Sequence, residues 1–182
     1  LNQIIKLKDV MRVLLLSFYL VLIFLCLNNT AFCQTSTLDS LSLVALYNNT
    51  NGQNWTINTN WLNGPVSTWY GITVFGNKVV SINLSNNNLT GQIPDSLYLL
   101  SSLSYLNMSN NSLTGAIPEG IGFLTNLVRL ILSDNNLSGQ IPDTLKNLRI
   151  LFELLLNKND LSGAVPASLN QLDSLKQLFI ND

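Results

Sequence analysis

The sequence contains no histidine, and charged residues make up only 10% of its 182 residues. It also lacks a glycine-rich loop of the kind that cradles phosphate groups. The net charge of −1 is too small to indicate binding to nucleic acid or to a charged membrane surface. The acidic residues are scattered, and Asp134, Asp160 and Asp182 lack the spacing of calcium ligands. We therefore expect no enzyme activity, no cofactor and no metal site.

Cysteine occurs twice, as Cys26 within an uncharged apolar run at residues 13–27 and as Cys33 shortly after it. A charged start, an apolar core of about fifteen residues and a small residue near a cleavage point are typical of a secretory signal peptide. We expect translation from Met11 and cleavage between Cys33 and Gln34. The secreted chain would then hold no disulfide and no thiol, although its compartment is oxidising.

Two other interpretations of this N-terminal segment stay open. The apolar run is shorter than the roughly twenty residues of a membrane-spanning helix, but it is compatible with an uncleaved signal anchor. Acylation of Cys33 in a lipoprotein is the second alternative, although Phe32 stands where that signal requires a small residue.

A 24-residue unit occurs four times between residues 79 and 174. One copy, residues 103–126, reads LSYLNMSNNSLTGAIPEGIGFLTN, and a fifth copy begins at Leu175 and stops before its Asn. Such a period predicts a solenoid of stacked units. Every complete copy holds an Asn, a Gly and a Pro at fixed offsets: Asn87, Asn111, Asn135 and Asn159; Gly91, Gly115, Gly139 and Gly163; Pro94, Pro118, Pro142 and Pro166.

These copies resemble the leucine-rich repeat family, specifically the 24-residue subtype with the pattern LxxLxLxxNxLxGxIP that is best known from plant extracellular proteins. The resemblance implies an α/β repeat solenoid, a right-handed superhelix with a parallel sheet on its concave face and an N-terminal helical cap. We therefore divide the chain into three parts. Residues 1–33 are the upstream residues and the leader, residues 34–78 are the cap, and residues 79–182 are the repeats.

The cap segment does not fit the repeat pattern, and we expect it to cover the apolar end of the first repeat. Apolar residues at helical spacing predict a short amphipathic helix, with Asp39 or a neighbouring Ser or Thr as its N-cap. The apolar positions are Leu38, Leu41, Val44 and Ala45. Residues 70–74 resemble a short strand that leads into the repeats.

Three tryptophans, Trp55, Trp61 and Trp69, lie close together in the cap and predict a packed aromatic cluster rather than a carbohydrate-stacking site. The segment resembles the family's cap pattern C-x-W-x-G-V-x-C, which Trp69, Gly71 and Ile72 match. Where that pattern has its two cysteines, this sequence has Ser67 and Val74. The cysteine-free cap resembles that of secreted leucine-rich repeat proteins from the Bacteroidetes group.

Fixed positions of the unit predict how it folds. Residues such as Leu103, Leu106 and Met108 should point inward from short strands that stack about 4.8 Å apart in a parallel sheet. Each repeat Asn amide should hydrogen-bond backbone groups of its own and adjacent turns in an Asn ladder, and Gly with Pro should form a second tight corner. The Leu columns then form one core, as at Leu89, Leu113, Leu137 and Leu161.

Side chains that point outward from the strands are the remaining candidates for recognition. In the first two units they are small and polar apart from Tyr105: Ser81, Asn83, Ser85, Ser104, Asn107 and Ser109. Further along the chain, adjacent strands would place Ile131, Leu155 and Phe179 in one exposed row. Contiguous exposed apolar surface often marks a contact site. The alternatives are that these positions vary freely or are covered by further repeats. The candidate ligand-binding residues are Tyr105, Val128, Arg129, Ile131, Phe152, Glu153, Leu155 and Phe179.

The resemblance implies a secreted or cell-surface recognition module that binds a protein or peptide on its concave face, with a glycan as an open alternative. Two rival functions are a structural or adhesive spacer in a larger surface protein and the ectodomain fragment of a receptor kinase. We expect further sequence after Asp182, because an end there would leave Leu175, Leu178 and Ile180 on an uncapped sheet edge.

Overall fold

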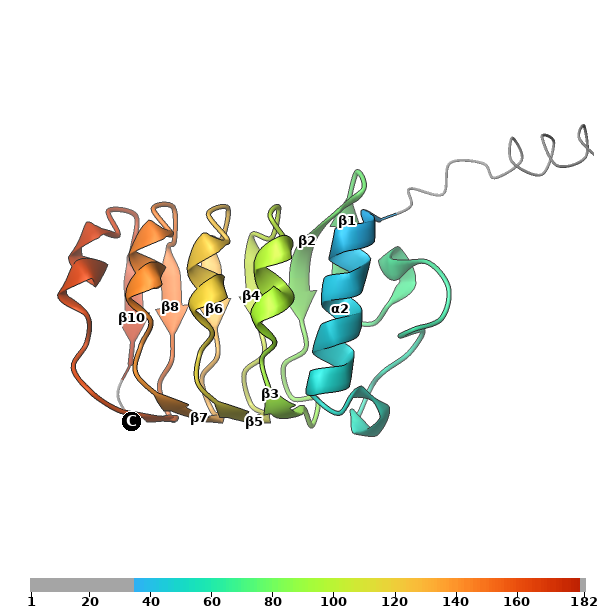
Figure 1. The fold of residues 1–182 in the computed structure, drawn as a ribbon, viewed down its shortest axis with the longest axis horizontal. Coiled ribbons are helices and arrows are strands. Elements are labelled where there is room, and N and C mark those ends of the chain that lie inside the picture. Colours follow the sequence, from blue (N-terminus) through green and yellow to red (C-terminus); the bar gives the residue numbers. More distant parts are fainter. Residues whose placement is uncertain (1–34, 181–182) are drawn as a thin grey trace, which may run out of the picture. The chain divides into compact units, whose positions relative to one another are not determined.

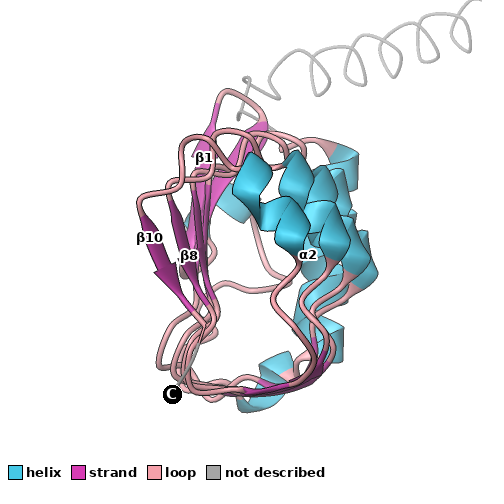
Figure 2. Cartoon of the chain, turned by 90° about the vertical axis from the view of Figure 1, so that its left-hand side faces the viewer, coloured by secondary structure: helices cyan, strands magenta, loops and turns pink. Residues whose placement is uncertain are grey.

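Residues 35–180 are described by the computed structural model, and they form a row of stacked repeats (Figure 1). The predicted signal peptide and its cleavage point lie outside the described residues. Viewed along the row, one sheet forms one wall and the helices form the opposite wall (Figure 2). A second, smaller sheet lies where the chain passes from the first wall to the second. The predicted α/β repeat solenoid is confirmed.

The first wall, called the main sheet, pairs equivalent residues of successive repeats, as in Leu106 with Leu130 and Leu130 with Leu154. The strands from the repeats run parallel, which confirms stacking in register. The first strand pairs antiparallel with the second, so the sheet is mixed at its cap end. In spatial order the strands are β1 (Ile72–Phe75), β2 (Lys78–Asn83), β4 (Tyr105–Asn107), β6 (Arg129–Ile131), β8 (Glu153–Leu155) and β10 (Gln177–Phe179).

A second sheet, which the sequence analysis missed, forms between the repeat Asn and the repeat Pro. The corner there does contain the expected left-handed glycine, with φ of 89° at Gly91. The residues before this glycine are extended, and stacking brings them beside the same segment of the next copy, so that Thr90 pairs with Ser112. The strands are β3 (Thr90–Gln92), β5 (Ser112–Gly115), β7 (Asn136–Gly139) and β9 (Asp160–Leu161).

The helical wall begins with α2 (Thr37–Asn49) and continues with one short 3₁₀ helix in each repeat. Each of these helices starts directly after the repeat Pro, whose fixed φ suits the entry to a helical turn. The repeat helices are η3 (Asp95–Leu99), η4 (Glu119–Phe123), η5 (Asp143–Asn147) and η6 (Ala167–Gln171), and the cap adds η1 (Gly52–Asn54) and η2 (Val66–Thr68).

The core lies between the walls and is built from the predicted Leu columns. Leu103, Leu106 and Met108 are fully buried, as are Leu89, Leu113 and Leu137. Leu161 is half-buried, and in the fifth copy Leu178 is 44% exposed. Burying one Leu side chain stabilises a fold by roughly 1.5 to 3 kcal/mol, so the shared core rather than any single repeat accounts for the stability of the stack.

The predicted cap helix is present, and two of the four residues assigned to its apolar face, Val44 and Ala45, are half-buried, but the other two were wrong. Leu38 and Leu41 are 52% and 58% exposed, whereas the buried face carries Asp39 and Ser42 with two leucines, Leu43 and Leu46. The two polar side chains are buried because they bind backbone groups of the first repeat. Ser42 Oγ donates to the carbonyl of Ser96 at 2.5 Å, and the Asp39 carboxylate accepts a backbone N–H.

Of the two expected alternatives for the N-cap of this helix, the neighbouring Ser is correct and Asp39 is not. Ser36 occupies the N-cap position, and its side chain forms no capping hydrogen bond. The strand expected at residues 70–74 is present as β1, and it turns back into β2 as an antiparallel hairpin.

The tryptophan cluster packs as predicted. Trp55, Trp61 and Trp69 are each at most 6% exposed, with ring centroids 4.8 Å apart for the first pair and 4.9 Å for the second. Tyr47 of α2 stacks on Trp61 at 5.7 Å. Each indole N–H donates to a backbone carbonyl, so none of the three tryptophans leaves its polar group unpaired. The cluster therefore serves as the apolar centre of a cap that has no disulfide.

Candidate ligand-binding surface

The solvent-facing side of the main sheet carries two rows of side chains that the strand register aligns. Six of the eight predicted site residues lie on these rows. The other two, Val128 and Phe152, lie just before β6 and β8. The backbone N–H of Phe152 donates to the carbonyl of Val128 at 2.8 Å. The first row is Ser81, Tyr105, Arg129, Glu153 and Gln177, and the second is Asn83, Asn107, Ile131, Leu155 and Phe179.

The second row changes from polar to apolar along the solenoid. Asn83 and Asn107 lie at the cap end, and the next three copies carry Ile131, Leu155 and Phe179 at this position. Phe179 is 58% exposed and Phe152 is 37% exposed, while the other apolar side chains of this region are half-buried. We call the five together the apolar patch: Val128, Ile131, Phe152, Leu155 and Phe179.

In the polar half of the surface the side chains bind one another. Asn107 Nδ2 donates to the Tyr105 hydroxyl at 3.1 Å, and Asn107 Oδ1 accepts from the backbone and hydroxyl of Ser109 at 3.0 and 2.8 Å. Ser109 is only 6% exposed, so the expectation that it faces outward was wrong. These internal bonds leave fewer free donors and acceptors for a ligand than the sequence suggests.

An ion pair lies in the first row, beside the apolar patch. Arg129 Nε is 3.6 Å from Glu153 Oε2, and the two side chains are 52% and 14% exposed. The two residues are direct partners in the register of β6 and β8. Because Arg129 is half in solvent, the pair contributes little to folding stability.

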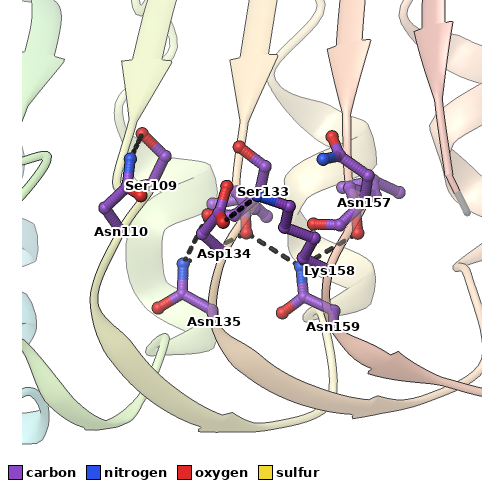
Figure 3. Close-up of polar contacts among 10 residues, drawn as sticks. Ser109, Asn110, Ser133, Asp134, Asn135, Asn157, Lys158 and Asn159 are labelled. Carbon is purple, nitrogen blue, oxygen red and sulfur yellow. Dashed lines mark hydrogen bonds and ion pairs between the residues drawn. The ribbon is translucent and has the colours of Figure 1, made fainter. Parts of the chain in front are cut away.

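Beneath the end of the strands, the Asn ladder holds adjacent copies together (Figure 3). Asn159 Nδ2 donates to the carbonyl of Leu132 in the preceding copy at 3.0 Å and to that of Leu156 in its own copy at 2.9 Å. Asn135 makes the equivalent bonds to Met108 and Leu132. The ladder fixes where each strand ends, and therefore which side chains reach the surface.

A second ion pair at this edge was missed by the sequence analysis. Lys158 Nζ lies 2.9 Å from Asp134 Oδ1 (Figure 3), and both residues have positive φ, 53° and 56°. The same position in earlier copies holds Asn86 and Asn110, also with positive φ. A signal for the pair was available, because Asp134 and Lys158 stand at the same offset of adjacent copies.

Between residues 35 and 180, no group of three or more His, Cys, Asp or Glu side chains lies close enough to hold a metal ion. In the same range we find no helix with the length and apolar character that a membrane crossing requires.

The chain is similar in sequence and in fold to known proteins. Residues 78–100, 102–124 and 126–148 match the family described as Leucine Rich Repeat. A chain of the BIR3–SERK2 complex from Arabidopsis thaliana is similar, with a TM-score of 0.70 and 34% identity, over 79% of this chain and 80% of that one. A plant ice-binding protein gives a TM-score of 0.74 and 30% identity, over 81% of this chain and 49% of its own.

A third similar structure is a chain from the complex of the Arabidopsis receptor kinase HAESA with the peptide hormone IDA and the co-receptor SERK1. Its TM-score is 0.54 and its identity 37%, over 56% of this chain and 17% of that one. Comparison with curated proteins gives no significant match.

Proposed function

The chain belongs to the leucine-rich repeat family, and from this premise we propose that it is a secreted, non-catalytic module that binds a protein or peptide on the main sheet, the concave face of the expected superhelix. Two of the similar structures support this proposal, because one is a complex between two proteins and the other includes a peptide hormone. The predicted leader at residues 11–33 supports secretion.

The apolar patch is the observation that carries the proposal. Two phenylalanines, Phe152 and Phe179, are exposed there beside three half-buried aliphatic side chains that lie on adjacent strands or directly before one. A soluble protein gains nothing in folding stability from aromatic side chains left in water, and contiguous apolar surface of this kind is typical of a contact site.

A substitution of the patch tests the proposal. Protein expressed from the full chain would be immobilised, and peptides enriched from a phage-displayed library of random dodecapeptides would be assayed against two double variants. We expect Phe152→Ser with Leu155→Ser to lose most of the binding. The matched control is Leu38→Ser with Leu41→Ser, which removes exposed leucines from α2 and should leave binding unchanged.

Equal binding to both double variants, or no enriched peptide at all, would contradict the proposal and favour the spacer function. An ectodomain fragment of a receptor kinase is compatible with the proposal, since such a fragment would bind its ligand in the same way.

A second candidate function is binding to ice through the second sheet. Its outward side chains are uncharged and polar apart from Asp160, and all but the half-buried Thr90 are exposed. They repeat at strand spacing, about 4.8 Å, so they present hydroxyl and amide groups in a regular array. They are Thr90, Gln92, Ser112, Thr114, Asn136, Ser138, Asp160 and Ser162. The similarity to a plant ice-binding protein favours this candidate.

Thermal hysteresis measures this second function directly. We expect the protein to lower the freezing point below the melting point, and we expect Thr114→Lys to abolish the effect by placing a long charged side chain in the array. Thr125→Lys, at an exposed position outside the sheet, should keep it. Absence of hysteresis in the unsubstituted protein would remove this candidate.

A further inference from the structure

Arg129 has hydrogen-bonding capacity that the fold does not use. Among residues 35–180 its guanidinium makes one polar contact, from Nε to Glu153 Oε2 at 3.6 Å, and neither Nη group forms a hydrogen bond. The side chain is 52% exposed, so these donors face solvent. A guanidinium with open Nη groups has the planar fork that binds a carboxylate through two parallel hydrogen bonds.

Glu153 is placed to orient this arginine. Its side chain is 14% exposed, and its backbone pairs with that of Arg129 across β6 and β8. A carboxylate held on a strand restricts the Nε end of the guanidinium and leaves the opposite edge accessible. Glu153 is therefore a positioning residue in this scheme.

The charges around the patch favour an anionic partner. Lys176 is exposed and lies next to Phe152, whose carbonyl accepts the Lys176 N–H at 2.9 Å. Among the described residues Lys176 forms no ion pair, while Lys158 is paired with Asp134. With Glu153 already opposite Arg129, the surface beside the patch keeps an excess positive charge, although the whole chain has a net charge of −1.

The arginine also lies between apolar groups. Val128 and Phe152 come directly before β6 and β8, and Ile131 and Leu155 follow two residues after Arg129 and Glu153, on the same face of the sheet. A ligand that covers this area buries apolar surface on both sides of the guanidinium. Such burial excludes water from a charged hydrogen bond and strengthens it.

We propose that the patch takes an extended peptide segment in which an Asp or Glu lies beside an aliphatic or aromatic residue, with Arg129 binding the carboxylate. This inference rests on the proposed function and names the chemical class of its ligand. Arg129 selects the acidic residue, and the apolar patch supplies most of the buried area. The polar half of the surface, at the cap end, contributes less to binding, since its side chains bind one another.

The test uses the same phage-displayed library of random dodecapeptides. We expect the enriched sequences to hold an acidic residue within two positions of Leu, Ile, Val or Phe. Synthetic peptides from this set would be titrated against the unsubstituted protein and against Arg129→Gln, which removes the charge at an exposed position. Because hydrogen bonds to charged groups are the strong ones, we expect affinity to fall about tenfold or more.

Two controls separate this effect from a general change in charge or folding. Lys146→Gln removes one positive charge from the helical wall and should leave affinity within about twofold, as expected for a surface charge distant from the ligand. Replacing the acidic residue of the peptide by Gln or Asn should weaken binding to the unsubstituted protein and have no further effect on Arg129→Gln.

Enriched peptides without an acidic residue, or equal affinity for the unsubstituted protein and Arg129→Gln, would overturn the role of Arg129. Peptide binding on the patch would still stand in that case, provided that the Phe152→Ser and Leu155→Ser double variant loses it. If no peptide is enriched, both the proposed function and this inference fail.

Discussion

The carboxylate of Asp39 is completely buried and accepts the backbone N–H of Val79 at 2.8 Å, although the two residues stand 40 positions apart. Lys78 Nζ approaches the same carboxylate at 3.4 Å from a partly exposed position. The bond joins the cap helix to the first strand of the repeats. In the repeats the equivalent N–H donates to the carbonyl three residues earlier, as from Leu103 to Leu100 at 2.9 Å, so the Asp39 carboxylate takes the place of that acceptor. This bond explains why a polar residue of α2 faces the core.

Removing this carboxylate should destabilise the whole described unit. In Asp39→Ala the buried N–H of Val79 loses its acceptor, and we expect the free energy of unfolding to fall by about 1 to 3 kcal/mol. Lys78→Gln should cost less than about 1 kcal/mol, because the lysine is partly exposed. Urea denaturation measures both variants, and equal losses would show that the ion pair rather than the backbone bond matters.

The Asn ladder predicts a difference between two equivalent positions. Asn111 Oδ1 accepts from the N–H groups of Asn87 and Leu89, at 3.0 and 2.9 Å. Asn159 Oδ1 accepts from Leu137 N–H, its one recorded donor within residues 35–180. Each unpaired buried N–H costs about 1 to 3 kcal/mol, so Asn111→Leu should destabilise the protein more than Asn159→Leu. A reversed order in urea denaturation would contradict this account of the ladder.

Two glycines at the same repeat position should differ in their tolerance of alanine. Gly91 and Gly139 have similar φ, 89° and 78°, but a Cβ on Gly91 would lie 2.3 Å from the Asn49 carbonyl oxygen, whereas on Gly139 the nearest atom is 3.6 Å away. Gly139→Ala should cost about 1 to 2 kcal/mol for the left-handed backbone. Gly91→Ala should cost about 1 to 3 kcal/mol more, because the end of α2 must move. Thermal unfolding of the two variants measures the difference.

One exposed carboxyl should titrate abnormally. The Lys146 ammonium, 2.6 Å from Asp143, and the Ser168 hydroxyl both donate to this carboxylate, and these hydrogen bonds lower its pKa. Lys146→Gln should therefore raise the pKa of Asp143 toward its ordinary value, and Lys176→Gln, directly before β10, should not. Carbon-detected NMR titration of the Asp143 carboxyl distinguishes these results.

The sign of the corresponding stability effect follows from the direction of this shift. A pKa that is lower in the folded protein than in the unfolded chain stabilises the fold above the unfolded pKa. That contribution is lost as the pH falls through the folded pKa. We expect the acid limb of the stability profile to be shallower in Lys146→Gln, although the exposure of Asp143 keeps the effect small.

Repetition allowed much of this fold to be predicted from the sequence. When the apolar residues recur every 24 positions, the copies can bury them by stacking in register. The inward columns, the Asn ladder and the row from Ile131 to Phe179 all follow from that one constraint. The tryptophan cluster was also predictable, because three large aromatic side chains in one short segment need a common interior.

The tertiary structure alone decided the features that depend on a partner from another part of the chain. Helical spacing favoured Leu38 and Leu41 as the buried face of α2, but the Val79 N–H and the Ser96 carbonyl made burial of Asp39 and Ser42 favourable instead. The second sheet likewise exists because stacking brings extended segments together. Periodicity records what each residue has in common with its copies, whereas hydrogen bonding of a buried polar group depends on which backbone atom the fold places opposite it.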